Sequence, residues 1–158
     1  MLLQYGCDKT LVKTIEELLP SLKKQRGVVN NGKPQLNRIV RDCFVYVIHD
    51  KTVHNSINKL MQCDQSSISV MEYGLRQHYL SWHQDNSGQP NDRRKKSMSM
   101  LLNNDFEGGH LEFKIDENIS QSNLHKPGDY VIFDSLIRHR VTRVTQGIRK
   151  TLVCWAYS

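Results

Sequence analysis

The chain has 158 residues and a mass of 18.4 kDa, with 38% hydrophobic and 24% charged residues. This length allows one domain with a core of its own, and the composition excludes a disordered tail. The formal net charge of +6 favours acidic partners such as nucleic acid or the ribosome, although a basic solvated surface would have the same composition.

The sequence contains no pattern typical of export or of membrane insertion. Its start lacks the charged and long apolar regions of a signal peptide, and no apolar run approaches the length of a membrane span. The four cysteines (Cys7, Cys43, Cys63 and Cys154) are scattered, and none forms the C-x-x-C pair of a zinc ribbon. We therefore expect a cytoplasmic protein with reduced thiols and no membrane partner. The sequence does not indicate an oligomeric state.

The first third of the chain contains two segments with apolar residues at helical spacing. The first predicts a helix over residues 8–24, capped by Asp8 or Thr10 and bent near Pro20. The following elements are expected to be a polar loop over 27–34, a β-rich run over 43–48 and a second helix over 51–62.

From residue 66 onward, short β-rich runs alternate with glycine-containing turns. Many short strands at this spacing predict a sandwich or barrel. We therefore expect a mainly β (α+β) fold in a single domain over residues 1–158. A jelly roll over about 65–158 would be supported by helices over about 1–64. The expected strands cover residues 68–73, 78–83, 97–102, 110–115, 130–133, 139–145 and 151–157.

His83 and Asp85 form a candidate metal-binding pair. In an extended segment, residues two positions apart project from the same face, so this imidazole and carboxylate can converge on one ion. The same spacing occurs in His110 and Glu112. The second pair alternates with apolar residues in a way that is typical of the outward face of an edge strand, so we favour a structural interpretation for it.

A distal histidine and an arginine favour the first pair. His139 lies at the expected start of a strand, and Arg149 follows ten positions later, after a glycine turn. Two histidines and one carboxylate leave open coordination positions, as is typical of non-haem iron(II) sites. A guanidinium can bind a carboxylate through two parallel hydrogen bonds. This combination predicts a metal site that also binds both ends of a keto-acid cosubstrate.

The stretch from Tyr73 to Trp155 resembles the 2-oxoglutarate/iron(II) dioxygenases, specifically the prolyl 4-hydroxylase-like branch and its small microbial and phage relatives. It covers just over half of the chain, and the N-terminal third resembles the supporting helices of that family only loosely. The resemblance implies a double-stranded β-helix, which is a form of jelly roll. The motifs that follow the order of the family are Trp82-His-Gln-Asp85, Arg94-Lys-Lys-Ser-Met-Ser99, Glu107-Gly-Gly-His-Leu-Glu-Phe113, Lys126-Pro-Gly-Asp-Tyr-Val-Ile-Phe133 and the segment 139–149.

The resemblance implies a role for each matched side chain. His83, Asp85 and His139 would bind Fe(II), and Arg149 would bind the C5 carboxylate of 2-oxoglutarate. Tyr73, ten positions before His83, matches a tyrosine whose hydroxyl helps to position this cosubstrate.

Two further residues match positions close to the substrate. Arg94 matches a position that faces the substrate in peptide hydroxylases, and Trp155 matches an indole on the last strand. Strand parity places Trp155 on the same face as Arg149. Structural alternatives stay open, because Tyr73 and Trp155 could be core aromatic residues and Arg94 could belong to a solvated basic turn.

The chain departs from the family pattern at two positions. Leu80 stands three positions before His83, where the family often has an aromatic residue, and Tyr79 lies beside it. The second contact to the cosubstrate is therefore not assigned. Arg143 stands where relatives often have proline, and it could reshape the rim or contact the substrate.

The resemblance implies a 2-oxoglutarate- and Fe(II)-dependent dioxygenase that consumes O₂ and releases succinate and CO₂, with ascorbate as a further candidate cofactor. The favoured substrate is a proline of a peptide or protein, hydroxylated at C4. The basic run over 93–96 would suit an acidic peptide or a ribosomal target. We expect selectivity to come from the polar loops over 84–96 and 27–34.

Two alternatives stay open. An AlkB-type nucleic-acid demethylase shares the metal triad and would account for the charge. However, Trp155 stands six positions after Arg149, and such enzymes usually have a second arginine several residues beyond the first. A non-catalytic jelly-roll binding module would be expected to lack a metal ligand or the arginine, and this sequence has all four residues. We rank the prolyl substrate first.

Overall fold

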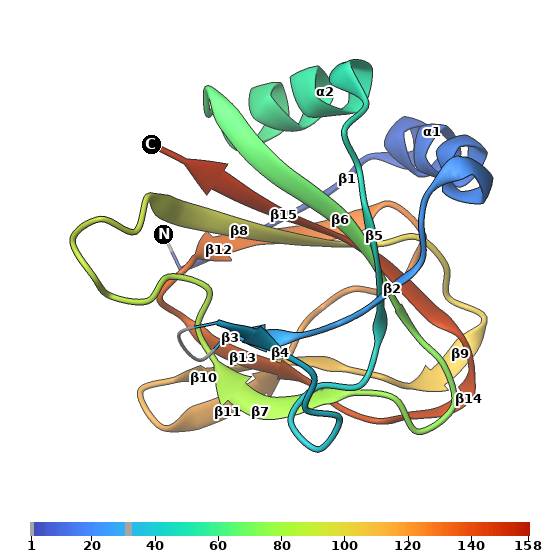
Figure 1. The fold of residues 1–158 in the computed structure, drawn as a ribbon, viewed down its shortest axis with the longest axis vertical. Coiled ribbons are helices and arrows are strands. Elements are labelled where there is room, and N and C mark those ends of the chain that lie inside the picture. The colour runs from blue at the N-terminus through green and yellow to red at the C-terminus, as the bar shows by residue number, and fades with distance from the viewer. Residues whose placement is uncertain (1, 31–32) are drawn as a thin grey trace.

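The computed structural model describes residues 2–30 and 33–158 and shows two antiparallel β-sheets that face each other, with two helices outside one of them (Figure 1). We refer to the seven-stranded sheet as the major sheet and to the four-stranded sheet as the minor sheet. This arrangement is the expected mainly β jelly roll. None of the helices in the described residues is both long and apolar enough to cross a membrane.

The major sheet combines strands from both ends of the chain. The last strand lies at its centre, between two strands of the middle of the sequence, and the first strand forms one edge. In spatial order the strands are β1 (Leu3–Cys7), β12 (Asp129–Asp134), β8 (Arg94–Leu101), β15 (Arg149–Tyr157), β6 (Gln65–Tyr73), β5 (Phe44–Val47) and β2 (Gln25–Arg26).

The minor sheet carries no helix on its outer face in the view of Figure 1. Its strands, in spatial order, are β11 (Asn118–Gln121), β10 (Leu111–Ile115), β13 (Arg138–Val141) and β7 (Tyr79–His83). Two further sheets of two strands each lie in the described residues, namely β9 (Phe106–Gly108) with β14 (Val144–Gly147), and β3 (Val29–Asn30) with β4 (Pro34–Gln35).

The two helices pack on the outer face of the major sheet. Helix α1 (Lys9–Leu18) begins at Asp8, whose carboxylate accepts a hydrogen bond from the amide of Leu11 at 3.0 Å. Helix α2 (Lys51–Met61) begins in the same way at Asp50. Buried apolar residues of both helices contact the sheet, as the helical spacing predicted.

The core therefore has two parts on opposite faces of the major sheet. The part under the helices includes Ile57 of α2 and Leu152 of β15. The part between the two sheets includes Tyr73 of β6, Phe133 of β12 and Phe113 of β10. Alternate residues of β15 accordingly face the helices and the space between the sheets.

The N-terminal third contains less helix than the sequence predicted. The first helix ends at Leu18, six residues earlier than expected, and a 3-10 turn (Leu19–Ser21) that contains Pro20 follows it. Strands β1 to β5 also lie in this third, and β5 agrees with the predicted β-rich run over 43–48. Strands β1 to β4 were missed because strands of two to five residues are too short to show a period, and β1 is stabilised by β12, far along the chain. Positions 31 and 32 of the predicted loop lie outside the described residues.

In the C-terminal part, the segment predicted as one strand over 139–145 is two strands, β13 and β14. The chain leaves the minor sheet after Val141 and pairs with β9 from Val144. The strands β9 and β11 were not predicted, and the others agree with the prediction to within a few residues.

Candidate metal centre and cosubstrate pocket

Two histidines face each other across neighbouring strands of the minor sheet. His83 ends β7 and His139 lies in β13, and the antiparallel pairing makes them direct partners with ring centroids 4.2 Å apart. Asp85 follows β7, and its Oδ1 lies 3.5 Å from Nε2 of His139. One ligand atom from each of these three side chains lies within 4.8 Å of the others. The fold therefore gathers the three predicted metal ligands into one cluster.

Both imidazoles are oriented by the same local contact. Nδ1 of His83 lies 2.9 Å from the carbonyl oxygen of Ser81, and Nδ1 of His139 lies 2.9 Å from the carbonyl oxygen of Ile137. A carbonyl only accepts hydrogen bonds, so each Nδ1 carries a hydrogen, and in the neutral imidazole each Nε2 presents a lone pair. A backbone contact of this kind is typical of metal-binding histidines.

Two buried serines that the sequence analysis did not identify hold Asp85 in place, Ser97 at its carboxylate and Ser135 at its backbone amide. The hydroxyl of Ser97 in β8 donates to Oδ2 of Asp85 at 2.6 Å, and it lies 2.9 Å from the hydroxyl of Ser135. The carbonyl of Ser135 also accepts hydrogen bonds from the amides of Asp85 and Asn86, each at 2.9 Å. The position of Ser97 in the buried part of β8 was the sequence signal that could have identified this residue. Its contact with Asp85 was not predictable, because the packing of the strands determines which side chain Ser97 meets.

The protonation of the cluster follows from its burial and from the mutual contacts of its members. Burial, reinforced by the imidazole of His139, lowers the pKa of His83 to about 3. Burial alone would raise the pKa of Asp85, but His139 and the hydroxyl of Ser97 outweigh it and lower this pKa to about 2. Burial also opposes a charge on His139, yet the Asp85 carboxylate raises its pKa above the ordinary value of 6.5.

These properties fit a divalent iron ion. His83 and His139 each offer an imidazole nitrogen, and Asp85 offers a carboxylate oxygen that is ionised at neutral pH. Two nitrogens and one oxygen on one side of the ion match the 2-His-1-carboxylate set of non-haem Fe(II) enzymes.

The cluster lies on the wall of a cavity of about 700 Å³ between the two sheets. This volume falls within the usual range of ligand pockets. Alternate residues of β15 line the opposite wall, as strand parity predicted. They are Arg149, Thr151, Val153 and Trp155.

Arg149 is a cation buried in this cavity without an acidic partner among the described residues. Its side chain is 2% exposed, and its single hydrogen bond runs from Nη1 to the hydroxyl of Thr151 at 3.4 Å. Its Nε is buried and has no partner among the described residues. Burial lowers the pKa of Arg149 to about 10, so the side chain remains charged at neutral pH. These properties fit a carboxylate of a bound ligand.

A glycine makes room for Arg149. Gly109 has a φ of +59°, and a Cβ at this position would lie 2.9 Å from Cδ of Arg149 and 2.8 Å from Cγ2 of Val144. Both the backbone conformation and the close approach therefore require glycine.

Tyr73 lies beside Arg149 in the cavity. The two residues are direct partners across β6 and β15, and the guanidinium carbon lies 5.5 Å from the tyrosine ring centroid. Tyr73 is 1% exposed, and its hydroxyl donates a hydrogen bond to the sulfur of Met71 at 3.8 Å. Burial raises the pKa of Tyr73, so the hydroxyl stays protonated and can donate a hydrogen bond to a ligand.

Arg94 and Trp155 also line the cavity and lie against each other. The guanidinium carbon of Arg94 is 5.3 Å from the centroid of the indole ring. Arg94 is neutralised by Asp92, which accepts hydrogen bonds from Nε at 3.0 Å and from Nη2 at 2.6 Å. The Nε1 of Trp155 is buried without a partner among the described residues. Arg94 therefore contributes a paired guanidinium to the cavity wall.

Tyr79 is a residue of the site that the sequence analysis left without a role. Its ring stacks on the imidazole of His83, with centroids 3.7 Å apart and an angle of 16° between the planes. It lies four positions before His83 on the same face of β7, so strand parity was the signal that could have identified it. Leu80 points to the opposite face of this strand.

The remaining candidates lie elsewhere. His110 is exposed, and Glu112 accepts a hydrogen bond from Nε of Arg140 at 2.8 Å. Neither residue joins the metal-ligand cluster in the part of the chain that the structure describes. Arg143 is also exposed and contributes its backbone carbonyl to the amide of Gly109.

Comparison with known proteins gives matches over most of the chain. The family model of the 2OG-Fe(II) oxygenase superfamily matches residues 68–157, which is more than half of the sequence. A PKHD-type hydroxylase of Crocosphaera subtropica is 29% identical over 161 residues, and the alignment covers 97% of this chain and 64% of the relative. The chain therefore spans less than two thirds of the length of this relative.

Solved structures with the same fold include two prolyl hydroxylases. A prolyl-4-hydroxylase of Pseudomonas putida superposes with a TM-score of 0.75 at 16% identity, covering 99% of this chain and 92% of that chain. A prolyl hydroxylase of Trichoplax adhaerens, in complex with a peptide fragment of the hypoxia inducible factor oxygen degradation domain, superposes with a TM-score of 0.74 at 15% identity. It covers 98% of this chain and 83% of that chain. At these identities the likeness shows the fold.

Proposed function

Because the chain belongs to the 2OG-Fe(II) oxygenase superfamily, we propose that it hydroxylates a peptidyl proline at C4, with consumption of 2-oxoglutarate and O₂ and release of succinate and CO₂. We further propose that residues 1–158 act as a single domain. Strand β1 pairs with β12 in the major sheet, which supports this part of the proposal.

The observation that carries the proposal is the shared cavity of the metal-ligand cluster and Arg149. His83, Asp85 and His139 would hold Fe(II), and Arg149 with Thr151 would hold the C5 carboxylate of 2-oxoglutarate. Bound Fe(II), together with 2-oxoglutarate and O₂, supplies the oxidising chemistry that converts a substrate C–H bond to C–OH. The requirement of this reaction for a metal and a dicarboxylate matches the two kinds of group in the cavity.

The other residues of the cavity would orient these groups and exclude water. The ring of Tyr79 covers one face of His83, and the ring of Phe133 lies 5.0 Å from that of His139 in an edge-on contact. Ser97 holds the second oxygen of Asp85, which leaves Oδ1 directed toward His139. The imidazoles are thereby restricted to one orientation before any ligand binds.

A peptide substrate is supported by the relatives and by the rim of the cavity. The similar structures include a prolyl hydroxylase with a bound peptide fragment. The rim includes the aliphatic side chains of Val28, Val29 and Val40, which suit a proline ring. A nucleic-acid demethylase would need aromatic side chains that stack on an extruded base, whereas the residues of the N-terminal third that line this cavity are Val28, Val29, Val40 and Arg41. The net charge of +6 still makes nucleic acid or the ribosome a partner to be tested.

The proposal is tested by measuring succinate release and the mass of proline-containing peptides after incubation with Fe(II), 2-oxoglutarate and ascorbate. We expect a gain of one oxygen atom on proline and an equal yield of succinate. His83→Ala should abolish both products because it removes a metal ligand. His110→Ala is the matched control and should retain them, since His110 is exposed and lies outside the cluster.

Two other results would contradict the proposal in different ways. Demethylation of alkylated oligonucleotides without any change in proline peptides would favour the AlkB-type alternative. An absence of turnover, combined with 2-oxoglutarate binding that does not depend on metal, would favour a non-catalytic binding module.

A further inference from the structure

Arg41 is a second cation in the cavity, and neither the metal centre nor the cosubstrate site uses it. It lies between β4 and β5 in the N-terminal third, outside the segment 68–157 that the family model matches. Its half-buried side chain lines the same cavity as His83 and Arg149. The cavity therefore contains more positive charge than one cosubstrate carboxylate requires.

The hydrogen-bond partners of Arg41 are all uncharged. Its Nη1 donates to the carbonyl of Val28 at 2.7 Å, its Nε contacts the sulfur of Cys43 at 3.3 Å, and its Nη2 contacts the sulfur of Met71 at 3.5 Å. Sulfur is a weak acceptor, and a guanidinium has more N–H groups than these contacts occupy. No carboxylate of the described residues forms an ion pair with it.

Arg149 shares this property, but it is already assigned to the cosubstrate carboxylate, whereas Arg94 and Arg38 form ion pairs. Arg94 is paired with Asp92 in two hydrogen bonds. Arg38, on the same loop as Arg41, is exposed and pairs with Asp42. A half-buried guanidinium without a counter-charge is unfavourable unless an anion joins it. Arg41 is thus positioned to bind an anionic group of a ligand.

An anionic group bound to Arg41 would lie close to the candidate metal centre. Its guanidinium carbon lies 5.0 Å from the ring centroid of Tyr79, and Tyr79 in turn stacks on His83. Val28, Val29 and Val40 line the cavity on the same side. A ligand here would meet an aliphatic surface and one cation together, which suits a peptide with an apolar ring and a neighbouring carboxylate.

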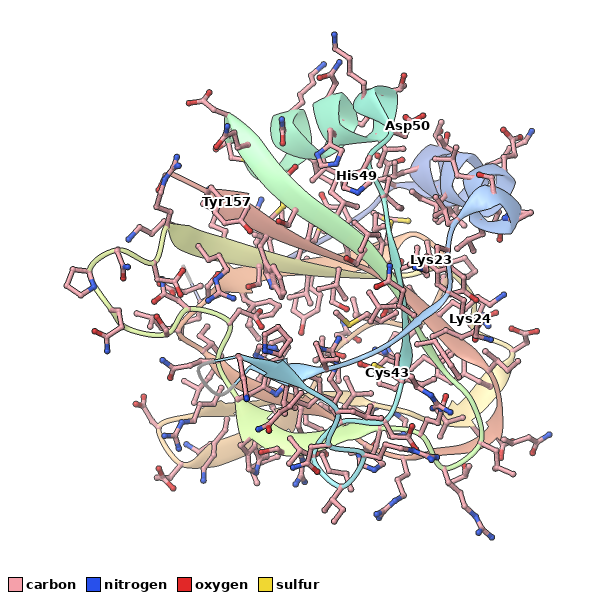
Figure 2. The ribbon with its side chains drawn as sticks, in the orientation of Figure 1. Lys23, Lys24, Cys43, His49, Asp50 and Tyr157 are labelled. Atoms are coloured by element: carbon pink, nitrogen blue, oxygen red, sulfur yellow. The ribbon has the colours of Figure 1, made fainter. Side chains whose placement is uncertain are left out.

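The segment that leads to Arg41 is also positively charged. Residues 18–41 contain six lysines and arginines and no acidic residue. Figure 2 shows Lys23 and Lys24 on the part of this segment that leads to β2, and Figure 1 shows the β3–β4 hairpin between the levels of the two sheets. Lys24 pairs with Glu72, and Arg26 and Arg38 pair with Asp42. The other three cations, Lys23, Lys33 and Arg41, form no ion pair among the described residues and would attract an acidic peptide.

We propose that Arg41 is a specificity-determining residue that binds an aspartate or glutamate side chain of the peptide substrate, next to the proline that is hydroxylated. This inference rests on the proposed function for the identity of the substrate. The inference adds that acidic peptides are preferred and that a residue inside the cavity determines this preference.

The test compares peptides that carry glutamate or glutamine at each of the positions flanking a proline. For one such position, the wild-type protein should show a kcat/KM for the glutamate peptide about tenfold to a hundredfold above that for the glutamine peptide, mostly through KM. Arg41→Gln should remove this preference, and Arg41→Lys should restore part of it. Arg38→Gln is the matched control and should keep the preference, since Arg38 is exposed and pairs with Asp42.

The comparison of two peptides separates recognition from a structural role. If Arg41 only supported Tyr79 and His83, Arg41→Gln would lower the turnover of both peptides equally, and this would overturn the inference. A higher KM for 2-oxoglutarate with an unchanged preference between the peptides would overturn it too. Thermal unfolding of each variant checks that the fold is retained.

Binding measurements keep this inference separate from the proposed function. If no proline is hydroxylated in any peptide, calorimetry of the same glutamate and glutamine peptides still tests Arg41. Tighter binding of the glutamate peptide that Arg41→Gln abolishes supports the inference even though the prolyl function fails. Equal binding of both peptides overturns the inference. Arg41-dependent binding of an RNA oligonucleotide, with no preference between the peptides, also overturns it in favour of a phosphate ligand.

Discussion

At the scale of single residues, backbone contacts fix which nitrogen of each histidine in the candidate metal centre carries the hydrogen. The carbonyl oxygens of Ser81 and Ile137 hold the Nδ1 hydrogens of His83 and His139. The proximity of the Asp85 carboxylate then makes the two histidines differ, because it raises the pKa of His139 while burial lowers that of His83. Without metal, His139 is the candidate ligand that gains a proton first as the pH falls, because its pKa is raised.

This difference predicts how metal affinity depends on pH. The metal competes with the proton on His139, so affinity for Mn(II) should decline by about tenfold per pH unit below the pKa of His139 and level off above it. His83 and Asp85, with pKa values of about 3 and about 2, add no further dependence above pH 5. Calorimetric titration with Mn(II) between pH 5 and 8 measures this slope.

Two outcomes of this titration would contradict the assignment. A slope of about a hundredfold per unit would mean that both histidines are protonated in the metal-free protein. A slope that changes in His110→Gln would mean that an exposed histidine takes part in binding.

At the scale of elements, the helix starts were predictable because each depends on a local contact. Asp8 and Asp50 cap the helices through the amide three residues later. The end of α1 was not predicted, although Pro20 indicated a bend, because leucines continue at helical spacing beyond Leu18. The division of the predicted strand over 139–145 was also not predictable, because it depends on the separate partners of β13 and β14.

The turn between β9 and β10 packs against Arg149, the first residue of β15. We therefore expect a specific effect of Gly109→Ala. The added methyl group would meet Cδ of Arg149 at 2.9 Å, and the φ of +59° would be strained. The KM for 2-oxoglutarate should therefore rise by about tenfold or more as the guanidinium is displaced. Steady-state kinetics with varied 2-oxoglutarate measures this.

Gly88→Ala provides the matched control for Gly109→Ala. Gly88 also has a positive φ, of +80°, but a methyl group added to it would meet no other atom within 4 Å. This variant should lose some stability and keep the KM for 2-oxoglutarate. An equal rise of the KM in both variants would show that backbone strain, rather than contact with Arg149, is the cause.

At the scale of the whole molecule, the candidate site joins the two sheets. The candidate metal ligands His83 and His139 belong to the minor sheet, and Asp85 lies in the loop after β7, whereas Arg149 and Tyr73 belong to the major sheet. The helices support the major sheet from its far face. A ligand that contacts metal and arginine together would therefore connect the two layers of the fold.

This arrangement predicts that metal and 2-oxoglutarate stabilise the folded protein together. At concentrations about a hundred times Kd, each ligand should add about 2.7 kcal/mol to the free energy of unfolding, which corresponds to a rise in Tm on the order of 5–10 °C. Thermal unfolding with Mn(II), with and without 2-oxoglutarate, measures both contributions. Removal of the metal with EDTA should reverse them.

Arg149→Gln separates the two ligands in this experiment. It should retain the rise in Tm caused by Mn(II) and lose the additional rise caused by 2-oxoglutarate. Equal stabilisation of this variant and the wild type by 2-oxoglutarate would contradict the assignment of the carboxylate site to Arg149.

The sequence by itself determined the features that depend on near neighbours. Strand parity placed Arg149 and Trp155 on one face of β15, and the spacing of His83 and Asp85 allowed both to approach one ion. Only the tertiary structure decided which distant segments meet. The register of β7 against β13 pairs His83 with His139, and packing brings Ser97 to Asp85. The same packing brings Arg41 from the N-terminal third into the cavity. Local periodicity specifies the face that a side chain occupies, but strand order and register depend on contacts across the whole chain.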